Sequence, residues 1–223
     1  MMKSRKKIRH LIGHFISKYL WEGLPRDLQI IISSKWGSLF NKNFTKHIVP
    51  IYCKLFYSNK DYLKQFCSSK GDWHYSSFQD FFTRHLRKKP TSKEDHIWMC
   101  EGLLCQKSQF KDLKEVSIKG EKKDIKIVFG DKNIKIPNSY FYSNIFLNNT
   151  NYHRIHSPLT GRIMWIKHIS GILAILRPWL NWESPSYPAL RNERVSMKIL
   201  DSKTGKPWYL SIVGGPGVGT ILL

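Results

Sequence analysis

Apolar residues near the start of the chain recur at the spacing of an amphipathic helix. Between positions 8 and 20 they lie on one face: Ile8, Leu11, Ile12, Phe15, Tyr19 and Leu20. Basic residues such as Lys7, Arg9 and Lys18 occupy the remaining positions. Such a helix can dock on its own domain, or it can lie in a membrane interface with its basic residues towards anionic headgroups. The pattern leaves both alternatives open.

Three further helices are predicted before the chain reaches Pro90. Their apolar spacing places them at residues 27–40, 44–56 and 78–87. The last of these should be capped at its start by Ser76 or Ser77. It should end before Pro90, because proline disfavours the helical conformation in the residue that precedes it.

Beyond Pro90 the pattern changes to alternation of apolar and polar residues. Ile125, Ile127 and Phe129 occupy alternate positions before Gly130, and a similar stretch follows over 134–136, so a β-hairpin is predicted here. Later strand-like stretches occupy residues 163–166, 195–200 and 208–213. We therefore predict an α+β fold, with an N-terminal helical region followed by a mostly antiparallel β body. The expected division is a basic, membrane-associating region, 1–90, and a β-rich body, 91–223.

The charge balance narrows the choice of partners. Lys and Arg number 37 against 16 Asp and Glu, which gives a formal net charge of +21. A field of this sign attracts nucleic acid or acidic lipid. The sequence has no zinc finger, RNA-recognition motif or other specific reader of nucleic acid, so nucleic-acid binding is the weaker alternative.

Cysteine usage and hydropathy limit the class of protein further. The four cysteines form no C-x-x-C pair, which favours reduced thiols: Cys53, Cys67, Cys100 and Cys105. Cys100, Cys105 and His96 lack the spacing of a zinc motif, and no metal is expected. No apolar run approaches the ~20 residues of a spanning helix, and polar residues interrupt the stretch that a signal peptide needs. We expect a peripheral protein at the cytoplasmic face of a membrane.

Four local motifs occur in one order along the chain. The first is Ser-Phe-Gln-Asp-Phe-Phe-Thr-Arg-His-Leu-Arg at 77–87, and the second is Cys-Glu-Gly at 100–102. The third is Asn-Tyr-His-Arg-Ile-His-Ser-Pro at 151–158, with Gly161 after it. The fourth joins Arg-Asn-Glu-Arg-Val at 191–195 to the glycine-rich stretches at 213–215 and 218–221. That glycine run has no following Lys-Ser/Thr, so it does not predict a nucleotide site.

In this order the motifs resemble the phosphatidylserine decarboxylase family over roughly residues 27–223. The family has two phenylalanines, an Arg and a Leu in the first motif, and Ala-Asp-Gly in the second. Its third motif is Tyr-His-Arg-x-His-x-Pro-x-x-Gly, and its fourth is Arg-Asn-Glu-Arg followed by Val-Gly-Ala and Val-Gly-Ser-Ile. The third motif is the most specific of the four.

The resemblance implies a cofactor that the protein makes from its own chain. In the family, a serine that follows a glycine attacks the preceding peptide carbonyl, and elimination leaves a pyruvoyl group on a new amino terminus. Its ketone condenses with phosphatidylserine and accepts the electrons released when carbon dioxide leaves, which yields phosphatidylethanolamine.

Three residues of this chain match the family's catalytic positions. His156 matches the base that activates the serine, and Glu101 matches its acidic partner, in the logic of a Ser-His-Asp triad. His153 matches the residue that donates a proton during decarboxylation. The resemblance leaves Phe81, Phe82 and Tyr152 as core or positioning residues.

Two departures from the family pattern bear on activity. Glu101 stands where the family has Asp, and its extra methylene displaces the carboxylate by more than about 1 Å unless the backbone adjusts. A displacement of about 1 Å can lower a rate on the order of a hundredfold. The only Gly-Ser pair is Gly37-Ser38, far from the family's cleavage position, and the chain ends at Leu223. We therefore expect residues 1–223 alone to form no pyruvoyl group.

The possible explanations are a truncation, a frameshift or a separately encoded α chain. The alternative function is a non-catalytic protein that binds anionic membrane surfaces through its basic first helix. Phosphatidylserine is the expected lipid partner in either case, and a homo-oligomer is a further possibility that the sequence leaves open.

Overall fold

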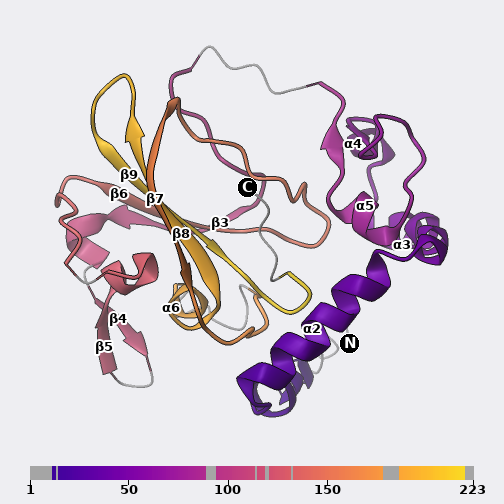
Figure 1. Cartoon of the computed structure of the whole chain (residues 1–223), viewed down its shortest axis with the longest axis horizontal. Coiled ribbons are helices and arrows are strands. Elements are labelled where there is room, and N and C mark those ends of the chain that lie inside the picture. Colours follow the sequence, from indigo (N-terminus) through magenta and orange to yellow (C-terminus); the bar gives the residue numbers. More distant parts are fainter. Residues whose placement is uncertain are drawn as a thin grey trace, which may run out of the picture. The chain divides into compact units, whose positions relative to one another are not determined.

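The structure is a computed structural model that describes residues 12–88, 94–118, 121–177 and 186–218, apart from positions 14, 114 and 132. The chain divides into two compact units. The sheet unit takes its described residues from Met1–Ser34, Leu104–Phe146 and Gly161–Leu223. The histidine unit takes its described residues from Lys35–Leu103 and Leu147–Thr160. Helices at the start and antiparallel strands afterwards confirm the α+β prediction (Figure 1).

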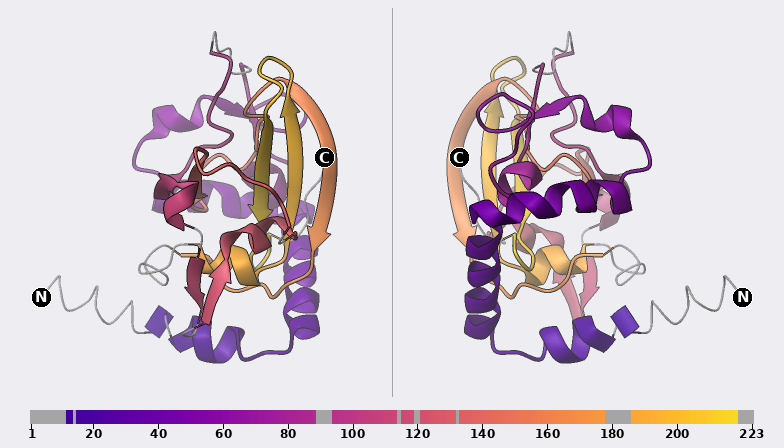
Figure 2. Two further views of the ribbon diagram at one scale, coloured as in Figure 1. Left: turned by 90° about the vertical axis from the view of Figure 1, so that its left-hand side faces the viewer. Right: turned by 90° about the vertical axis from the view of Figure 1, so that its right-hand side faces the viewer.

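Three antiparallel strands dominate the sheet unit. They pair in the order β7 (Gly161–Ile169), β8 (Arg194–Asp201) and β9 (Pro207–Val213), and they lie side by side in both views of Figure 2. Buried Met197 and Ile199 of the central strand β8 lie on the same sheet as buried Leu210 of β9. The strands predicted at 163–166, 195–200 and 208–213 are confirmed.

Shorter elements complete the sheet unit. They are β3 (Leu103–Gln109), η3 (Phe110–Leu113), β4 (Glu115–Ile118), β5 (Glu121–Asp124), β6 (Phe141–Phe146) and α6 (Tyr187–Arg191). β3 pairs with β6, and β4 pairs antiparallel with β5. The apolar core of this unit gathers buried residues from several of these connections: Phe110, Ile125, Val128, Phe129, Ile134 and Ala189.

The hairpin predicted around residue 130 is wrong. Ile125–Phe129 form a 3₁₀-helix, η4, which Asp124 caps by accepting the backbone N–H of Lys126. Gly130 follows it with a φ of +72°, a left-handed conformation that suits glycine. Ile125, Val128 and Phe129 are the buried residues of this turn, so the helical i, i+3, i+4 spacing prevails over the i, i+2 alternation.

A distant arginine helps to stabilise this helical turn. Arg194 of β8 is only 3% exposed. Its Nε donates to the carbonyl of Val128 at 2.7 Å, and its Nη2 donates to the carbonyl of Ile127 at 2.9 Å. These carbonyls therefore accept hydrogen bonds from a side chain rather than from a neighbouring strand. Local sequence patterns cannot reveal such a long-range contact.

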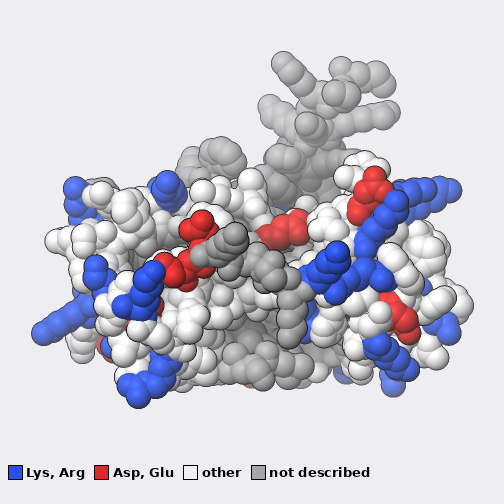
Figure 3. Space-filling view, turned by 90° about the horizontal axis from the view of Figure 1, so that it is seen from above, with Lys and Arg blue, Asp and Glu red and all other residues white. Residues whose placement is uncertain are grey.

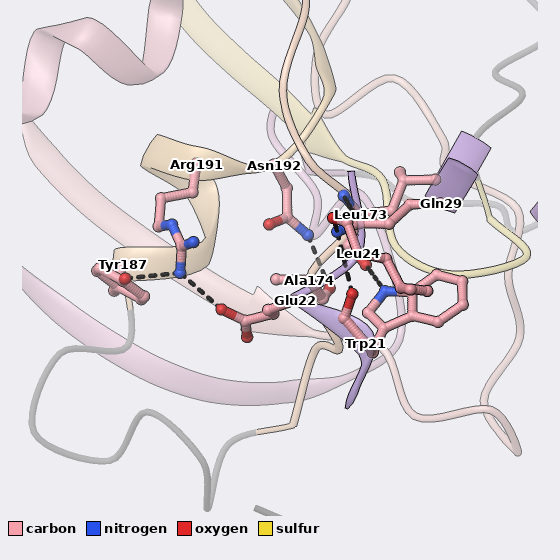
Figure 4. A network of polar contacts seen from close by, with 9 residues as sticks. All are labelled: Trp21, Glu22, Leu24, Gln29, Leu173, Ala174, Tyr187, Arg191 and Asn192. Atoms are coloured by element: carbon pink, nitrogen blue, oxygen red, sulfur yellow. Dashed lines mark hydrogen bonds and ion pairs between the residues drawn. The ribbon is translucent and has the colours of Figure 1, made fainter. Parts of the chain in front are cut away.

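Polar side chains bind the N-terminal segment to the rest of the sheet unit (Figure 4). Its elements are η1 (Ile16–Trp21) and the first part of α2 (Arg26–Phe40). Gln29 is 0% exposed; its Oε1 accepts the N–H of Leu173 at 2.8 Å, and its Nε2 donates to the carbonyl of Trp21 at 3.1 Å. Glu22 forms an ion pair with Arg191 at 2.8 Å. This part of the N-terminal region therefore docks on its own unit.

The histidine unit is built from short helices and one small strand pair. Its elements after α2 are η2 (Asn43–His47), α3 (Ile48–Phe56), α4 (Lys60–Leu63), β1 (Phe66–Cys67), α5 (Phe78–Phe82) and β2 (His85–Leu86). Buried Val49, Tyr57 and Phe81 form its apolar core. The helix predicted at 27–40 is confirmed as α2, and the one predicted at 44–56 is divided between η2 and α3.

The helix predicted at 78–87 begins as expected but ends early. Ser77 caps α5 by accepting the N–H of Asp80 at 3.1 Å. The helix stops at Phe82, and His85–Leu86 pair with β1 instead. Between them Arg84 is 0% exposed, because its guanidinium turns inward to backbone carbonyls of residues 150–151.

Some predicted features lie outside the described residues. These are the beginning of the first amphipathic helix, positions 8–11, the stop signal at Pro90 and the glycine segment from Gly219 onwards. Among the described residues, no helix combines the length and the apolar character needed to cross a bilayer. Basic side chains are more widespread than acidic ones on the face drawn in Figure 3.

Candidate functional site

The two candidate histidines lie on a segment of the histidine unit that has no regular secondary structure. Residues 152–157 follow a turn at 149–150 and precede the buried Pro158 and Leu159. The backbone N–H of Ile97 donates to the carbonyl of Pro158 at 2.8 Å, and the N–H of His156 donates to the carbonyl of Met99 at 2.7 Å. Hydrogen bonds to residues 97–99 therefore hold the segment beside the position of Glu101.

Arg84 fixes the backbone just before the histidines. Its Nη2 donates to the carbonyls of Thr150 and Asn151, each at 2.9 Å. The guanidinium lies over the ring of Phe66, 4.5 Å from the ring centroid, which is a cation–π distance. Tyr57 adds a hydrogen bond from its hydroxyl to the carbonyl of Thr150 at 2.7 Å.

Glu101 is exposed, but its carboxylate has three hydrogen-bond donors around it. The Tyr62 hydroxyl donates to Oε2 at 2.6 Å, and Asn151 Nδ2 donates to Oε1 at 2.6 Å. The backbone N–H of Tyr152 donates to Oε2 at 3.2 Å. Burial, and then the hydrogen bond to Glu101, raise the pKa of Tyr62 to about 12, so its hydroxyl remains protonated and donates.

His156 is half-buried, and its Nε2 lies 3.1 Å from the hydroxyl oxygen of Tyr152. The two rings stack with their centroids 5.5 Å apart. In the described part of the chain, no hydrogen bond or ion pair joins His156 directly to Glu101. The two residues are connected through Tyr152, whose backbone contacts one and whose side chain contacts the other.

His153 is held by the neighbouring backbone. Its Nδ1 lies 3.0 Å from the carbonyl oxygen of Asn151. Because a carbonyl can only accept, Nδ1 carries the hydrogen, and Nε2 is the nitrogen that can exchange a proton with a substrate. Burial lowers the pKa of His153; the hydrogen bond to Asn151 opposes this shift. The ring also packs on Phe82, with centroids 3.9 Å apart.

All three residues predicted from the third and second motifs thus lie in one unit, around the Asn151–Tyr152 backbone. Sequence reasoning missed Tyr62, which lies 39 positions before Glu101 and outside every quoted motif. It also assigned no role to Asn151 or Arg84, although both belong to the motifs. Their side chains act on carbonyls and carboxylates that only the fold brings near.

The single Gly-Ser pair is not at this site. Gly37 and Ser38 lie within α2, where the carbonyl of Gly37 accepts the backbone N–H of Asn41 at 3.2 Å. A serine attack on that carbonyl would have to break the helix. Among the described residues, no group of three or more His, Cys, Asp or Glu side chains is arranged to hold a metal ion.

The comparisons with known proteins agree with the motifs. The family model described as phosphatidylserine decarboxylase matches residues 78–223. This chain belongs to the phosphatidylserine decarboxylase family.

Curated relatives named phosphatidylserine decarboxylase proenzyme support the same assignment. The chain is 30% identical over 151 residues to the protein of Azoarcus sp. (strain BH72), covering 66% of this chain and 51% of that protein. It is 32% identical over 154 residues to that of Shewanella denitrificans, covering 66% and 52% respectively. The matched part therefore spans about half the length of these relatives.

Proposed function

We propose that this chain provides the histidine-bearing part of a pyruvoyl-dependent phosphatidylserine decarboxylase, which converts phosphatidylserine to phosphatidylethanolamine and carbon dioxide. The observation that carries the proposal is the shared support of the site. Asn151 contacts Glu101 through its side-chain amide and His153 through its carbonyl, and Tyr152 contacts both Glu101 and His156. Two adjacent residues, Asn151 and Tyr152, thereby hold all three side chains, which have different expected roles.

In this proposal His156 takes the proton of the attacking serine during self-cleavage. Its backbone is held by Met99 and its ring by Tyr152, so the imidazole is oriented before the serine arrives. A pre-oriented base removes part of the entropic cost of proton transfer.

His153 would exchange the proton needed at the substrate carbon. Its Nδ1–H is bound to the Asn151 carbonyl, so Nε2 is the atom available for this step. The lowered pKa of His153 makes its protonated form a stronger acid than an exposed histidine, which favours donation to carbon.

A pyruvoyl group, when present, supplies the electron sink for decarboxylation. Residues 1–223 contain no serine at the family's cleavage position, and Gly37-Ser38 is held in a helix. The histidines fit the formation of such a group, but the serine must come from a segment outside these residues, in the same polypeptide or in a separate α chain.

The direct test fuses residues 1–223 to the Gly-Ser-containing C-terminal segment of one of the relatives. We expect chain cleavage and release of carbon dioxide from phosphatidylserine vesicles. The variant His156→Ala should abolish both, whereas His153→Ala should cleave but decarboxylate roughly 10²–10⁴-fold more slowly. His74→Ala, an exposed histidine of the same unit, is the matched control. Unimpaired cleavage by a folded His156→Ala fusion would contradict the proposal.

We also propose that α3 attaches the protein to an anionic membrane surface. One face of this helix exposes Ile48, Ile51 and Leu55, with Leu55 70% exposed, while Val49 on the other face is buried. The residues on the exposed face are spaced i, i+3 and i+7, so they form one continuous stripe. Lys54 lies on the same helix and is exposed, which suits anionic headgroups.

Vesicle sedimentation tests this surface. The double variant Ile51→Asp, Leu55→Asp should lower binding to phosphatidylserine-containing vesicles by roughly tenfold or more, because two apolar side chains no longer enter the interface. Leu103→Asp is the control, since Leu103 is 55% exposed but lies outside α3. Equal binding of all three proteins, or equal binding to neutral vesicles, would contradict this attachment.

A further inference from the structure

The acidic partner expected for His156 is occupied elsewhere. Each oxygen of the Glu101 carboxylate accepts a short hydrogen bond, from Asn151 Nδ2 at 2.6 Å and from the Tyr62 hydroxyl at 2.6 Å. The third donor, the N–H of Tyr152, completes a carboxylate that is bound to loop and helix atoms rather than to an imidazole. These contacts position a backbone segment, which is a different task from stabilising a charged base.

Tyr152 is in turn held so that its hydroxyl points at His156. It is only 6% exposed, and its ring packs against two others: the ring of Phe66 at 5.5 Å and that of His156, also at 5.5 Å. Both ring pairs are stacked, with interplanar angles of 17° and 20°. The backbone bond to Glu101 and this packing leave the hydroxyl 3.1 Å from His156 Nε2.

We propose that the Tyr152 hydroxyl, and not the Glu101 carboxylate, is the direct hydrogen-bond partner of His156, and that Glu101 is a positioning residue for the 151–152 backbone. This inference rests on the proposed role of His156 as a base. For that role the ring must accept its proton at Nδ1, with Nε2–H donating to the Tyr152 oxygen. Burial raises the pKa of Tyr152, so the phenol stays neutral and orients the imidazole without a formal charge.

The arrangement also gives Glu101 influence over both histidines. Asn151 donates to Glu101 through Nδ2, and its carbonyl accepts the Nδ1–H of His153. Tyr152 donates its N–H to the same carboxylate and contacts His156 through its hydroxyl. A change at Glu101 should therefore disturb His153 as well as His156, whereas loss of the Tyr152 hydroxyl should affect His156 chiefly.

Nuclear magnetic resonance of the full chain with ¹⁵N-labelled histidine tests the proposal without any need for self-cleavage. In the parent protein we expect the neutral His156 ring to carry its hydrogen on Nε2. Tyr152→Phe should shift the His156 ring nitrogens and leave His153 nearly unchanged, and Glu101→Gln should shift both histidines. Tyr75→Phe, which removes another partly buried hydroxyl of the unit, should shift neither.

Two results would overturn the inference. One is a His156 ring with its hydrogen on Nδ1 in the parent protein; this result does not depend on whether any variant folds. The other is a Tyr152→Phe spectrum with unchanged His156 signals beside a Glu101→Gln spectrum in which His156 alone moves. Failure of the fused enzyme to cleave, with these spectra as expected, would instead count against the proposed function.

Discussion

The two units of this chain hold their segments in place in different ways. In the sheet unit, β8 is fixed along its length by backbone pairing with β7 on one side and β9 on the other. In the histidine unit, residues 152–157 lack such pairing and depend on side chains such as Arg84 and Glu101. The segment that carries the candidate histidines therefore owes its geometry to a few polar side chains, each of which is individually important.

A buried arginine occurs in each unit and makes the contrast measurable. Arg194 and Arg84 are 3% and 0% exposed, and both donate to backbone carbonyls. In the described part of the chain neither forms an ion pair with a carboxylate. Arg194 supports η4 beside a regular sheet, whereas Arg84 supports the turn that leads into the histidines.

The largest effect is expected for the arginines. Arg84→Met and Arg194→Met should each lower the free energy of unfolding by about 3 kcal/mol, because buried carbonyls lose charged donors. Only Arg84→Met should also change the resonances of His153 and His156. Denaturant titration and the labelled-histidine spectrum measure the two effects, with exposed Arg162→Met as a control expected within about 0.5 kcal/mol of the parent. Equal disturbance of the histidines by both buried variants would remove the distinction between the units.

The sequence predicted the regular strands and helices better than the irregular segments of the chain. Alternation located the strands that became β7, β8 and β9, and the Ser77 cap located the start of α5. These signals are local, so a short window of sequence contains them.

The errors and omissions have a common physical origin in long-range contacts. The segment at 125–129 became helical with support from Arg194, which lies more than 60 positions away. The second and third motifs singled out Glu101, His153 and His156 as candidates. The link through Tyr152 and the donor Tyr62 depend on side-chain directions that spacing does not encode.

The smallest expected effect is on the pH dependence of folding stability. Burial lowers the pKa of His153 in the folded state, so below the unfolded value of about 6.5 the unfolded chain binds more protons. Stability contributed by neutral His153 should therefore be complete above pH 6.5 and be lost as the pH falls towards the folded pKa. His153→Asn, which can retain the bond to the Asn151 carbonyl, should show a smaller drop in melting temperature between pH 7.5 and 5.5.

The matched control for this pH dependence is His74→Asn, since His74 is exposed in the same unit. It should reproduce the pH dependence of the parent protein. An identical drop for His153→Asn and the parent would show that the partly buried His153 does not carry this dependence.

In the proposed function, the segment around His156 takes part in making a pyruvoyl group. Mass spectrometry of the protein purified from its native source, with every associated polypeptide, tests it most directly. We expect a polypeptide that begins with a pyruvoyl group, identified by its reaction with a hydrazine, and its loss when His156→Ala is introduced into the gene. Recovery of the folded protein with no carbonyl-bearing polypeptide, or with an undiminished amount in the variant, would contradict this role of His156.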